Sequence, residues 1–583
     1  MRLIQSRSFY PRLTDICIDD LAARSGDIAG RILPSSAQSS ITINTAHQWL
    51  QTCLGTHSSC FSDGNQADTL CSLPTRVLDV GPEDGSQDPK LHIPGSNLGQ
   101  YAALSHCWGT HQTIKTTKAT LLDRMQTIPF QILPKTFQDA VIVTRQLGLR
   151  YLWIDSLCII QDCIDDWRYE AARMAAVYSN AVVTVAATAA EDSSKGLFIP
   201  RGAIATDQVE VRYKCYENRG RGKELGTATM ILCHQSTADS TGIEQSIDGA
   251  PLNQRAWVFQ ERLLSRRTLH FAADQIYWEC NSIYMSEDGT VYDDQPKGRL
   301  TQTFQSTHSI VQPASKHLQL HWTDIELWCR VVEQYTQRAL TKDSDRLPAL
   351  AGVSMKIIEK NGVVNPRDHQ TEIIAGLWRA FLHIGILWQS KDGQRKRPSS
   401  NRAPSWSWAA LEGPVRYDTW LWSPDMPREL ADCSAEIKVN GEYLTGDITY
   451  GVLTLECFIK QAVYDPSVDY CMGVVDDDNK MPCKTLFCEQ TGRCLGWCVM
   501  DDSYGMGGRP VWCALISENQ RSEAVQLNRS LTGTENILVL DSIGGSQHEY
   551  SRIGTGQIDL EIRWYDDDHG DRNEDYKRRI KII

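Results

Sequence analysis

The strongest constraint on the fold is an alternation of short apolar segments with helical ones in the first third of the chain. Three apolar segments, rich in residues suited to burial on both faces, are predicted to be strands: 101–108, 151–154 and 181–187. Between them, residues 135–148 place apolar side chains at helical spacing, and a second helix begins near Asp165. This strand–helix order predicts a parallel α/β sheet.

The first of these helices carries its own boundary signals. Thr136 is predicted to be its N-cap, with Asp139 three residues on as in a capping box, and Gly148 is placed to end it. A further strand is expected over 75–80, upstream of the alternating region.

The remaining chain changes character twice. A length of 583 residues predicts several structural units. Residues 320–390 show helical periodicity, whereas residues 430–583 hold short strand-like runs split by Gly, Asp and Asn. We therefore expect four segments: a lead-in with a Cys/His cluster (1–100), an α/β core (101–285), a helical companion region ending in Pro-Ser-Trp-Ser-Trp (286–425), and a β-rich C-terminal region (426–583).

Charge and hydropathy exclude two classes of partner. Lys plus Arg number 59 and Asp plus Glu number 72, so the net charge is −13 and a phosphate-backbone binder is disfavoured. The longest weakly polar run, 181–190, is far below the ~20 residues that span a bilayer, and the N-terminus lacks a signal-peptide run. Nineteen cysteines, an odd count, disfavour a fully paired secreted framework. We expect a cytoplasmic protein that binds no nucleic acid and has no membrane span.

Polar residues follow the first two predicted strands. Ser105, Trp108 and Gly109 end the first strand, and Asp155 ends the second. Ligands of open α/β sheets bind at the carboxyl ends of strands, so these residues are candidates for a binding crevice. The alternative is a plain core strand with turn-forming carboxylates. A His106–Cys107 nucleophile is disfavoured, because neighbouring side chains of a strand point to opposite faces.

A third candidate lies on the predicted helix over 255–265. Trp257 and Glu261 are four residues apart and share one helix face. A carboxylate beside an indole is partly desolvated, which raises its pKa and suits proton or oxocarbenium chemistry. The alternative is a surface ion pair with a nearby arginine such as Arg255 or Arg262.

The N-terminal segment contains a candidate metal site. Cys53, His57 and Cys60 are closely spaced, and Cys71 follows eleven residues later. Three Cys and one His suit tetrahedral zinc, although the spacing is not that of a usual zinc finger. The alternative is a set of reduced structural thiols.

Three sequence blocks together resemble one known family, the fungal heterokaryon-incompatibility (HET) domain proteins. The blocks are 103–109 (ALSHCWG), 151–162 (YLWIDSLCIIQD) and 255–265 (RAWVFQERLLS). Four flanking stretches, including 49–60 and 404–408, are similar to the flanks of larger members. The chain has His106 where the family commonly has Tyr, which weakens a catalytic role for this residue.

The resemblance implies a fungal cell-death effector of allorecognition or immunity, with a TIR/flavodoxin-like sheet. In enzymes of the related superfamily, a Glu four residues after a Trp cleaves the nicotinamide–ribose bond of NAD, and Trp257 and Glu261 have that spacing. The resemblance further implies that Glu261 stabilises the ribosyl cation and that Trp257 stacks on the ligand. It implies a crevice lined by Ser105, Trp108 and Gly109. Ribose or water would be bound by Asp155, Gln161 and Asp162, and the pyrophosphate would be met by Arg255.

Two other functions stay open at this stage. The domain could signal without catalysis, by homotypic assembly, or it could be a biosynthetic enzyme that uses the HET scaffold. Activation by a protein partner or by self-association is expected, since no nucleotide-binding or repeat sensor domain is evident in the sequence.

Overall fold

The structure is a computed structural model in which the chain forms two compact units, Met1–Thr307 and His308–Ile583. It describes residues 33–61, 70–109, 114–201, 206–215, 223–233, 244–291, 322–360, 373–391, 395–396, 398, 402–417, 427–440, 447–469, 483–501, 510–519, 533–546, 548–566 and 572–583. Among these residues, no helix combines the length and apolar character needed to cross a membrane.

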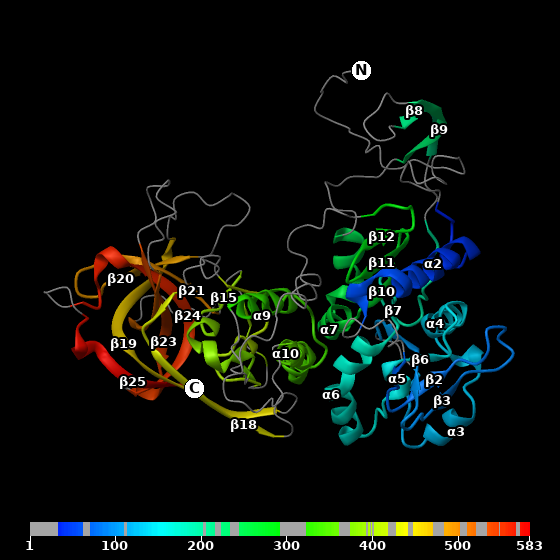
Figure 1. Ribbon diagram of the computed structural model, residues 1–583. Coiled ribbons are helices and arrows are strands. Elements are labelled where there is room, and N and C mark those ends of the chain that lie inside the picture. The colour runs from blue at the N-terminus through cyan, green and yellow to red at the C-terminus, as the bar shows by residue number, and fades with distance from the viewer. Residues whose placement is uncertain are drawn as a thin grey trace. The chain divides into compact units, whose positions relative to one another are not determined.

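The first unit is built on an eight-stranded sheet in the order β12-β11-β10-β7-β5-β6-β2-β3 (Figure 1). Its strands are β2 (Val77–Asp79), β3 (Lys90–His92), β5 (Tyr101–Ser105), β6 (Tyr151–Trp153), β7 (Val183–Ala186), β10 (Arg267–Phe271), β11 (Ile276–Cys280) and β12 (Tyr284–Ser286). The four central strands β6, β5, β7 and β10 are parallel, whereas the outer pairings are antiparallel. The expected parallel sheet is therefore the centre of a mixed sheet.

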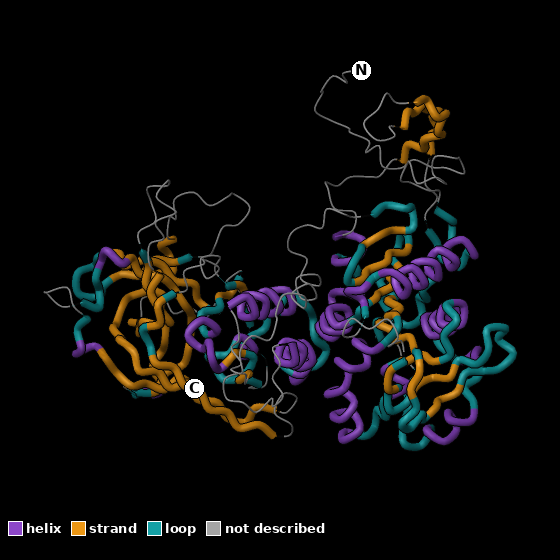
Figure 2. Tube along the Cα trace, viewed as in Figure 1, coloured by secondary structure: helices purple, strands orange, loops and turns teal. Residues whose placement is uncertain are grey.

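Helices accompany the strands of this unit (Figure 2). They are α2 (Ser40–Thr56), α3 (Leu121–Gln126), α4 (Lys135–Gln146), α5 (Asp155–Cys158), α6 (Ile164–Asn180) and α7 (Ala256–Leu264). Strands β1 (Cys71–Ser72) and β4 (Leu98–Gly99) form a separate small pair. A second antiparallel pair is formed by β8 (Thr206–Cys215) and β9 (Lys223–Cys233).

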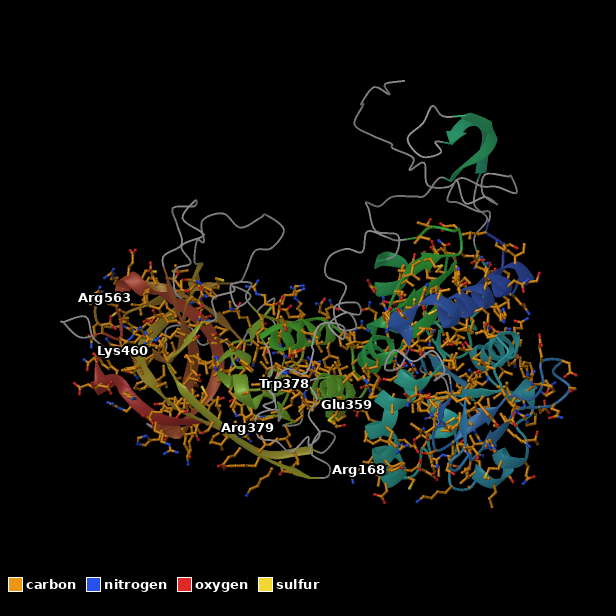
Figure 3. The ribbon with its side chains drawn as sticks, in the orientation of Figure 1. Arg168, Glu359, Trp378, Arg379, Lys460 and Arg563 are labelled. Carbon is orange, nitrogen blue, oxygen red and sulfur yellow. The ribbon has the colours of Figure 1, made fainter. Side chains whose placement is uncertain are left out.

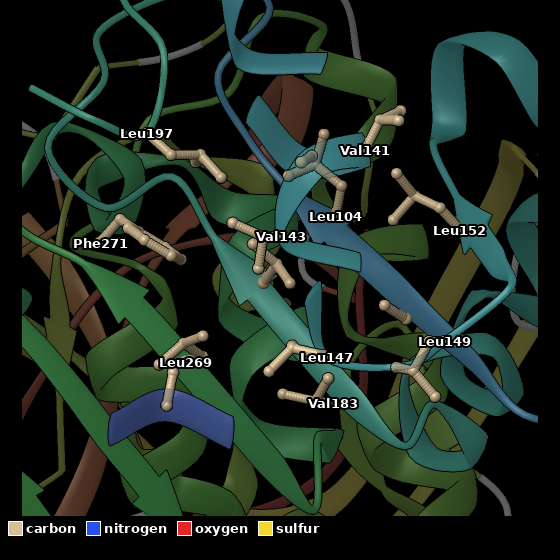
Figure 4. Close-up of a cluster of buried hydrophobic side chains, with 14 of the residues drawn as sticks. Leu104, Val141, Val143, Leu147, Leu149, Leu152, Val183, Leu197, Leu269 and Phe271 are labelled. Carbon is tan, nitrogen blue, oxygen red and sulfur yellow. The ribbon is translucent and has the colours of Figure 1, made fainter. Parts of the chain in front are cut away.

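Strand β5 shows how the sheet divides its side chains between two layers. Ala102 and Leu104 belong to the large core that includes residues of α2 and α4, part of which is shown in Figure 4. Tyr101 and Ala103 belong to a second cluster that includes residues of α6. Successive side chains of a strand point to opposite faces, so Ser105 is placed on the α6 face.

The start of α4 differs from the prediction. Pro134 is the N-cap, and Thr136 lies inside the helix, where its hydroxyl accepts from the Gly196 backbone amide at 3.1 Å. The Asp139 carboxylate accepts from the Leu197 amide at 2.9 Å. The capping-box assignment was wrong, because Pro134 is the N-cap and both side chains accept from backbone amides of a distant loop.

The second unit combines helices with a β-rich part. Its helices are α9 (Trp322–Tyr335), α10 (Pro348–Lys360) and α11 (Leu382–Gly385), and its short strands are β13 (Ile373–Ile374), β14 (Leu377–Trp378), β15 (Gln389–Ser390) and β16 (Val415–Arg416). A nine-stranded sheet follows, made of β17 (Arg428–Glu429), β18 (Asp432–Asn440), β19 (Asp447–Asp469), β20 (Lys484–Phe487), β21 (Cys494–Met500), β22 (Pro510–Asn519), β23 (Thr534–Ser542), β24 (Glu549–Asp559) and β25 (Lys577–Ile582). Because β22 pairs with β19 as well as with β23, six strands of this sheet close on themselves.

Side chains labelled in Figure 3 connect the helical and β-rich parts of this unit and brace the sheet. Arg379 donates to the Ala435 carbonyl of β18 at 2.8 Å, and the Lys460 ammonium of β19 donates to the Trp564 carbonyl at 2.9 Å. The two tryptophans of the Pro-Ser-Trp-Ser-Trp segment, Trp406 and Trp408, are fully buried. Trp408 borders a cavity of about 30 Å³ inside the unit.

Candidate functional site

The candidate site begins with a direct contact between Ser105 and Glu261. Ser105 ends β5 on the face that carries α6, and Glu261 lies on α7, which packs against α6. The Ser105 hydroxyl donates to a Glu261 carboxylate oxygen at 2.5 Å. Glu261 is only 6% exposed. The structure thus joins two sequence candidates that are 156 residues apart.

The environment of Glu261 raises the pKa of its carboxyl group to near neutral pH. Burial raises the pKa of Glu261 to about 7. The Ser105 hydrogen bond and the positive charge of Arg255 favour the ionised form and partly offset this rise. The negative charge of Asp155 acts in the same direction as burial. Glu261 can therefore exchange a proton near physiological pH, as acid–base catalysis requires.

Tyr178 is a third member of this group. Its hydroxyl donates to the Leu104 carbonyl of β5 at 3.1 Å, and it interacts with the Glu261 carboxylate. Burial raises the pKa of Tyr178 well above its usual value, so the phenol stays protonated and available as a donor. Tyr178 was not among the predicted site residues, because its contact with Glu261 depends on how α6 packs against α7.

A second contact links the ends of β5 and β6. The Trp108 indole donates to an Asp155 carboxylate oxygen at 2.7 Å. His106 Nε2 lies 3.9 Å from the other Asp155 oxygen, and burial lowers the pKa of His106 to about 4. Burial also raises the pKa of the Cys107 thiol. At pH 7 this pair is a neutral imidazole and a thiol, which does not support a thiolate nucleophile.

Arg255 and Trp257 lie at the start of α7 and are both half-buried. The Arg255 guanidinium donates to the His106 carbonyl, and its charge acts on Glu261. The Trp257 ring meets Trp167 edge to face, with centroids 6.5 Å apart. Trp257 therefore has a protein ring as its neighbour at the place where a ligand ring was expected.

The remaining candidates, Gln161, Asp162 and Gly109, make contacts within the loops that follow β5 and β6. Gln161 donates to the Asp155 carbonyl at 3.2 Å, and Asp162 accepts from the Lys118 amide at 2.8 Å. Gly109 has φ +73°, and a β-carbon at this position would lie 2.2 Å from Asp192. These contacts shape the loops after β5 and β6, and no contact of the three reaches Glu261 among those the structure describes.

The space beside the site is small. A cavity of about 10 Å³ is lined by Ser105 and by residues of β7, α7 and β10. This volume corresponds to about one water molecule. This cavity has no room for a dinucleotide.

The region that holds the candidate site matches a known protein family. Residues 101–261 match the family described as heterokaryon incompatibility protein (HET). The chain contains a HET domain. The match begins at the first residue of β5 and ends at Glu261, so it spans the candidate site. No curated protein and no solved structure matched the chain.

A cysteine and histidine cluster lies outside the HET match. Ligand atoms of Cys53, His57, Cys60 and Cys280 all lie within 4.8 Å of one another. Cys71, the fourth member expected from the sequence, is elsewhere, and its thiol donates to the carbonyls of Gly99 and Asn180, both at 3.4 Å. Sequence spacing alone missed Cys280, which lies more than 200 residues from the other three.

Proposed function

We propose that the HET domain hydrolyses NAD and that this reaction drives a cell-death response in heterokaryon incompatibility. The observation that carries the proposal is the buried Glu261 carboxyl group, with a pKa of about 7, bonded to the end of a central strand. Its spacing of four residues from Trp257 is the spacing that the family resemblance implies for NAD-cleaving enzymes of the related superfamily.

The topology supports a ligand site at this place. Numbered along the chain, the parallel strands β6, β5, β7 and β10 lie in the order 2-1-3-4, which agrees with the first four strands of the flavodoxin-like order 2-1-3-4-5. In such sheets ligands bind beyond the carboxyl ends of the strands, where the order reverses. Ser105 is the last residue of the strand at that reversal.

In the proposed reaction, water replaces nicotinamide on the ribose carbon. The C–N bond between ribose and nicotinamide breaks with its electron pair leaving on nicotinamide, while a water oxygen bonds to the ribose carbon and releases a proton. The ionised Glu261 would stabilise the positive charge that develops on the ribose. Ser105 would hold the carboxylate in place, and Arg255 would offer a cation to the pyrophosphate.

Substrate access fits a protein that is inactive until triggered. Glu261 is buried, whereas Trp108, Asp155, Arg255 and Trp257 are half-buried around it. We assign the opening of this layer to an activation step, either self-association or contact with a protein partner. A cell-death enzyme that was open at all times would harm the cell that makes it.

A second candidate function is signalling without catalysis. It is favoured by the Trp257–Trp167 contact and by a cavity that has room for only about one water. In this case Glu261 and Ser105 would fix α7 against β5, and the HET domain would act through homotypic assembly.

Purified full-length protein distinguishes the two functions. It is incubated with NAD, alone and after forced clustering, and free nicotinamide is measured. Hydrolysis predicts release by wild type, loss in Glu261→Ala, and retention in Glu191→Gln, which changes an exposed carboxylate of the same domain. If clustered wild type releases no nicotinamide while Glu261→Ala stays toxic in cells, the domain signals by assembly instead.

A further inference from the structure

The four side chains of the cysteine and histidine cluster come from two distant parts of the chain. On α2, Cys53 follows Ala46 and Leu50 on the helix face that is buried in the main core. His57 and Cys60 come from the turn after this helix. Cys280 ends β11, where Trp278 and Cys280 belong to the same core and therefore share a face of the sheet.

The geometry of the cluster suits a tetrahedral metal ion. Ideal zinc bonds of about 2.3 Å to sulfur and 2.0–2.1 Å to nitrogen place neighbouring ligand atoms about 3.5–3.8 Å apart. The Cys280 sulfur and His57 Nδ1 are 3.4 Å apart, and all four ligand atoms lie within 4.8 Å of one another. Three of the ligands are buried and His57 is half-buried.

A cation beside the cluster supports thiolate ligands. Arg267 lies on β10 directly opposite Cys280 of β11. Its Nε donates to the Cys53 sulfur at 3.1 Å, and its Nη2 donates to the Cys60 carbonyl at 2.9 Å. Three thiolates around a divalent ion leave one negative charge, and Arg267 compensates it from outside the ligand shell.

We propose that Cys53, His57, Cys60 and Cys280 bind one structural zinc ion. Sulfur-rich tetrahedral sites select zinc over calcium and magnesium, which take oxygen ligands. Four protein ligands leave no open position for a substrate or an activated water, so the site is structural. It joins α2 to β11, and it stands independently of the proposed NAD hydrolysis.

The proposed zinc site lies outside the residues that match the HET family, so the folded domain would extend beyond them. The family match covers residues 101–261, yet all four ligands lie outside it. The zinc ion would fasten the segment before the HET match to the segment after it. A protein truncated to the matched residues would lose both sides of this connection.

Metal analysis of the full-length protein tests the proposal. Wild type is expected to keep one equivalent of zinc after extensive dialysis, and Cys280→Ser is expected to keep close to none. Cys71→Ser is the matched control, because it removes another N-terminal cysteine whose thiol bonds only to backbone carbonyls among the contacts described. It should keep the full equivalent.

Wild type alone also gives a decisive result if Cys280→Ser fails to fold. Cobalt exchanged into the protein should give the absorption of a tetrahedral thiolate site, and a mercurial reagent should release one zinc per three protected thiols. Less than one retained equivalent, a disulfide among these cysteines in freshly prepared protein, or loss of zinc in Cys71→Ser with retention in Cys280→Ser would overturn the assignment.

Discussion

Replacing Glu261 by Gln should make the protein more stable at alkaline pH. Glutamine keeps an oxygen that can accept the Ser105 hydrogen bond, but it cannot ionise. In the wild type, burial raises the pKa of Glu261 from 4.5 to about 7. Ionisation of this buried group therefore lowers the free energy of unfolding of the wild type, but not that of the variant.

The sign and size follow from the two pKa values. Between pH 4.5 and about 7 the folded state binds more protons at this site than the unfolded state, so wild-type stability falls as pH rises. Each unit by which the pKa is raised corresponds to about 1.36 kcal/mol, so the wild type loses about 3 kcal/mol of stability above pH 7. Below pH 4.5 this loss vanishes.

Denaturant unfolding of wild type and Glu261→Gln across pH 4–8.5 measures this difference. Glu279→Gln is a matched control with the opposite trend. Although burial opposes it, the charge of Arg262 and the hydrogen bond of His270 hold the pKa of Glu279 well below its usual value. Removing that carboxylate should cost more stability at pH 7 than at pH 4.

Two outcomes would refute the reasoning about Glu261. One is a Glu261→Gln variant that is less stable than wild type at pH 8. The other is a stability difference that stays constant from pH 4 to pH 8.5, because it would show that the carboxyl group does not titrate in this range.

Three further predictions concern other parts of the chain. Ser105→Ala removes a hydrogen bond that favours ionised Glu261, so the acid limb of the pH–activity profile should move up by about 1–2 pH units; an unmoved limb would exclude this link. Gly109→Ala should lower the free energy of unfolding by about 2 kcal/mol or more, because φ is +73° and the new carbon would meet Asp192; an unchanged denaturation midpoint would contradict it. Arg552→Met should cost about 3–5 kcal/mol in the second unit, since it removes two charged hydrogen bonds from the buried Asp501 carboxylate, and thermal unfolding with no early transition would disprove that.

Local periodicity predicted the core of the fold well. The three segments of the alternating region became β5, β6 and β7, and the two helices became α4 and α6. The antiparallel pairing of the outer strands was not predicted, because pairing direction depends on how distant segments meet. Thr136 shows the same limit at a single residue, since its partner Gly196 is 60 positions away.

Only part of the candidate site was predicted, because its contacts also join segments that are distant in the sequence. Glu261 and Ser105 were each chosen from local patterns, but their contact depends on α7 returning to the end of β5. Cys280 was missed because its place in the cysteine and histidine cluster depends on the β10–β11 register and on where α2 crosses the sheet. The contact of Trp257 with Trp167 was not predicted, because the sequence does not show which side chains of α6 and α7 meet.

The most direct test of the central proposal is NAD cleavage by wild type and by Glu261→Gln. Both proteins are first shown to be folded, then clustered and incubated with NAD near pH 7.5. The proposal predicts nicotinamide and ADP-ribose from wild type, and a rate at least about 100-fold lower from Glu261→Gln. Equal rates in the two proteins, or no product from clustered wild type, would contradict it.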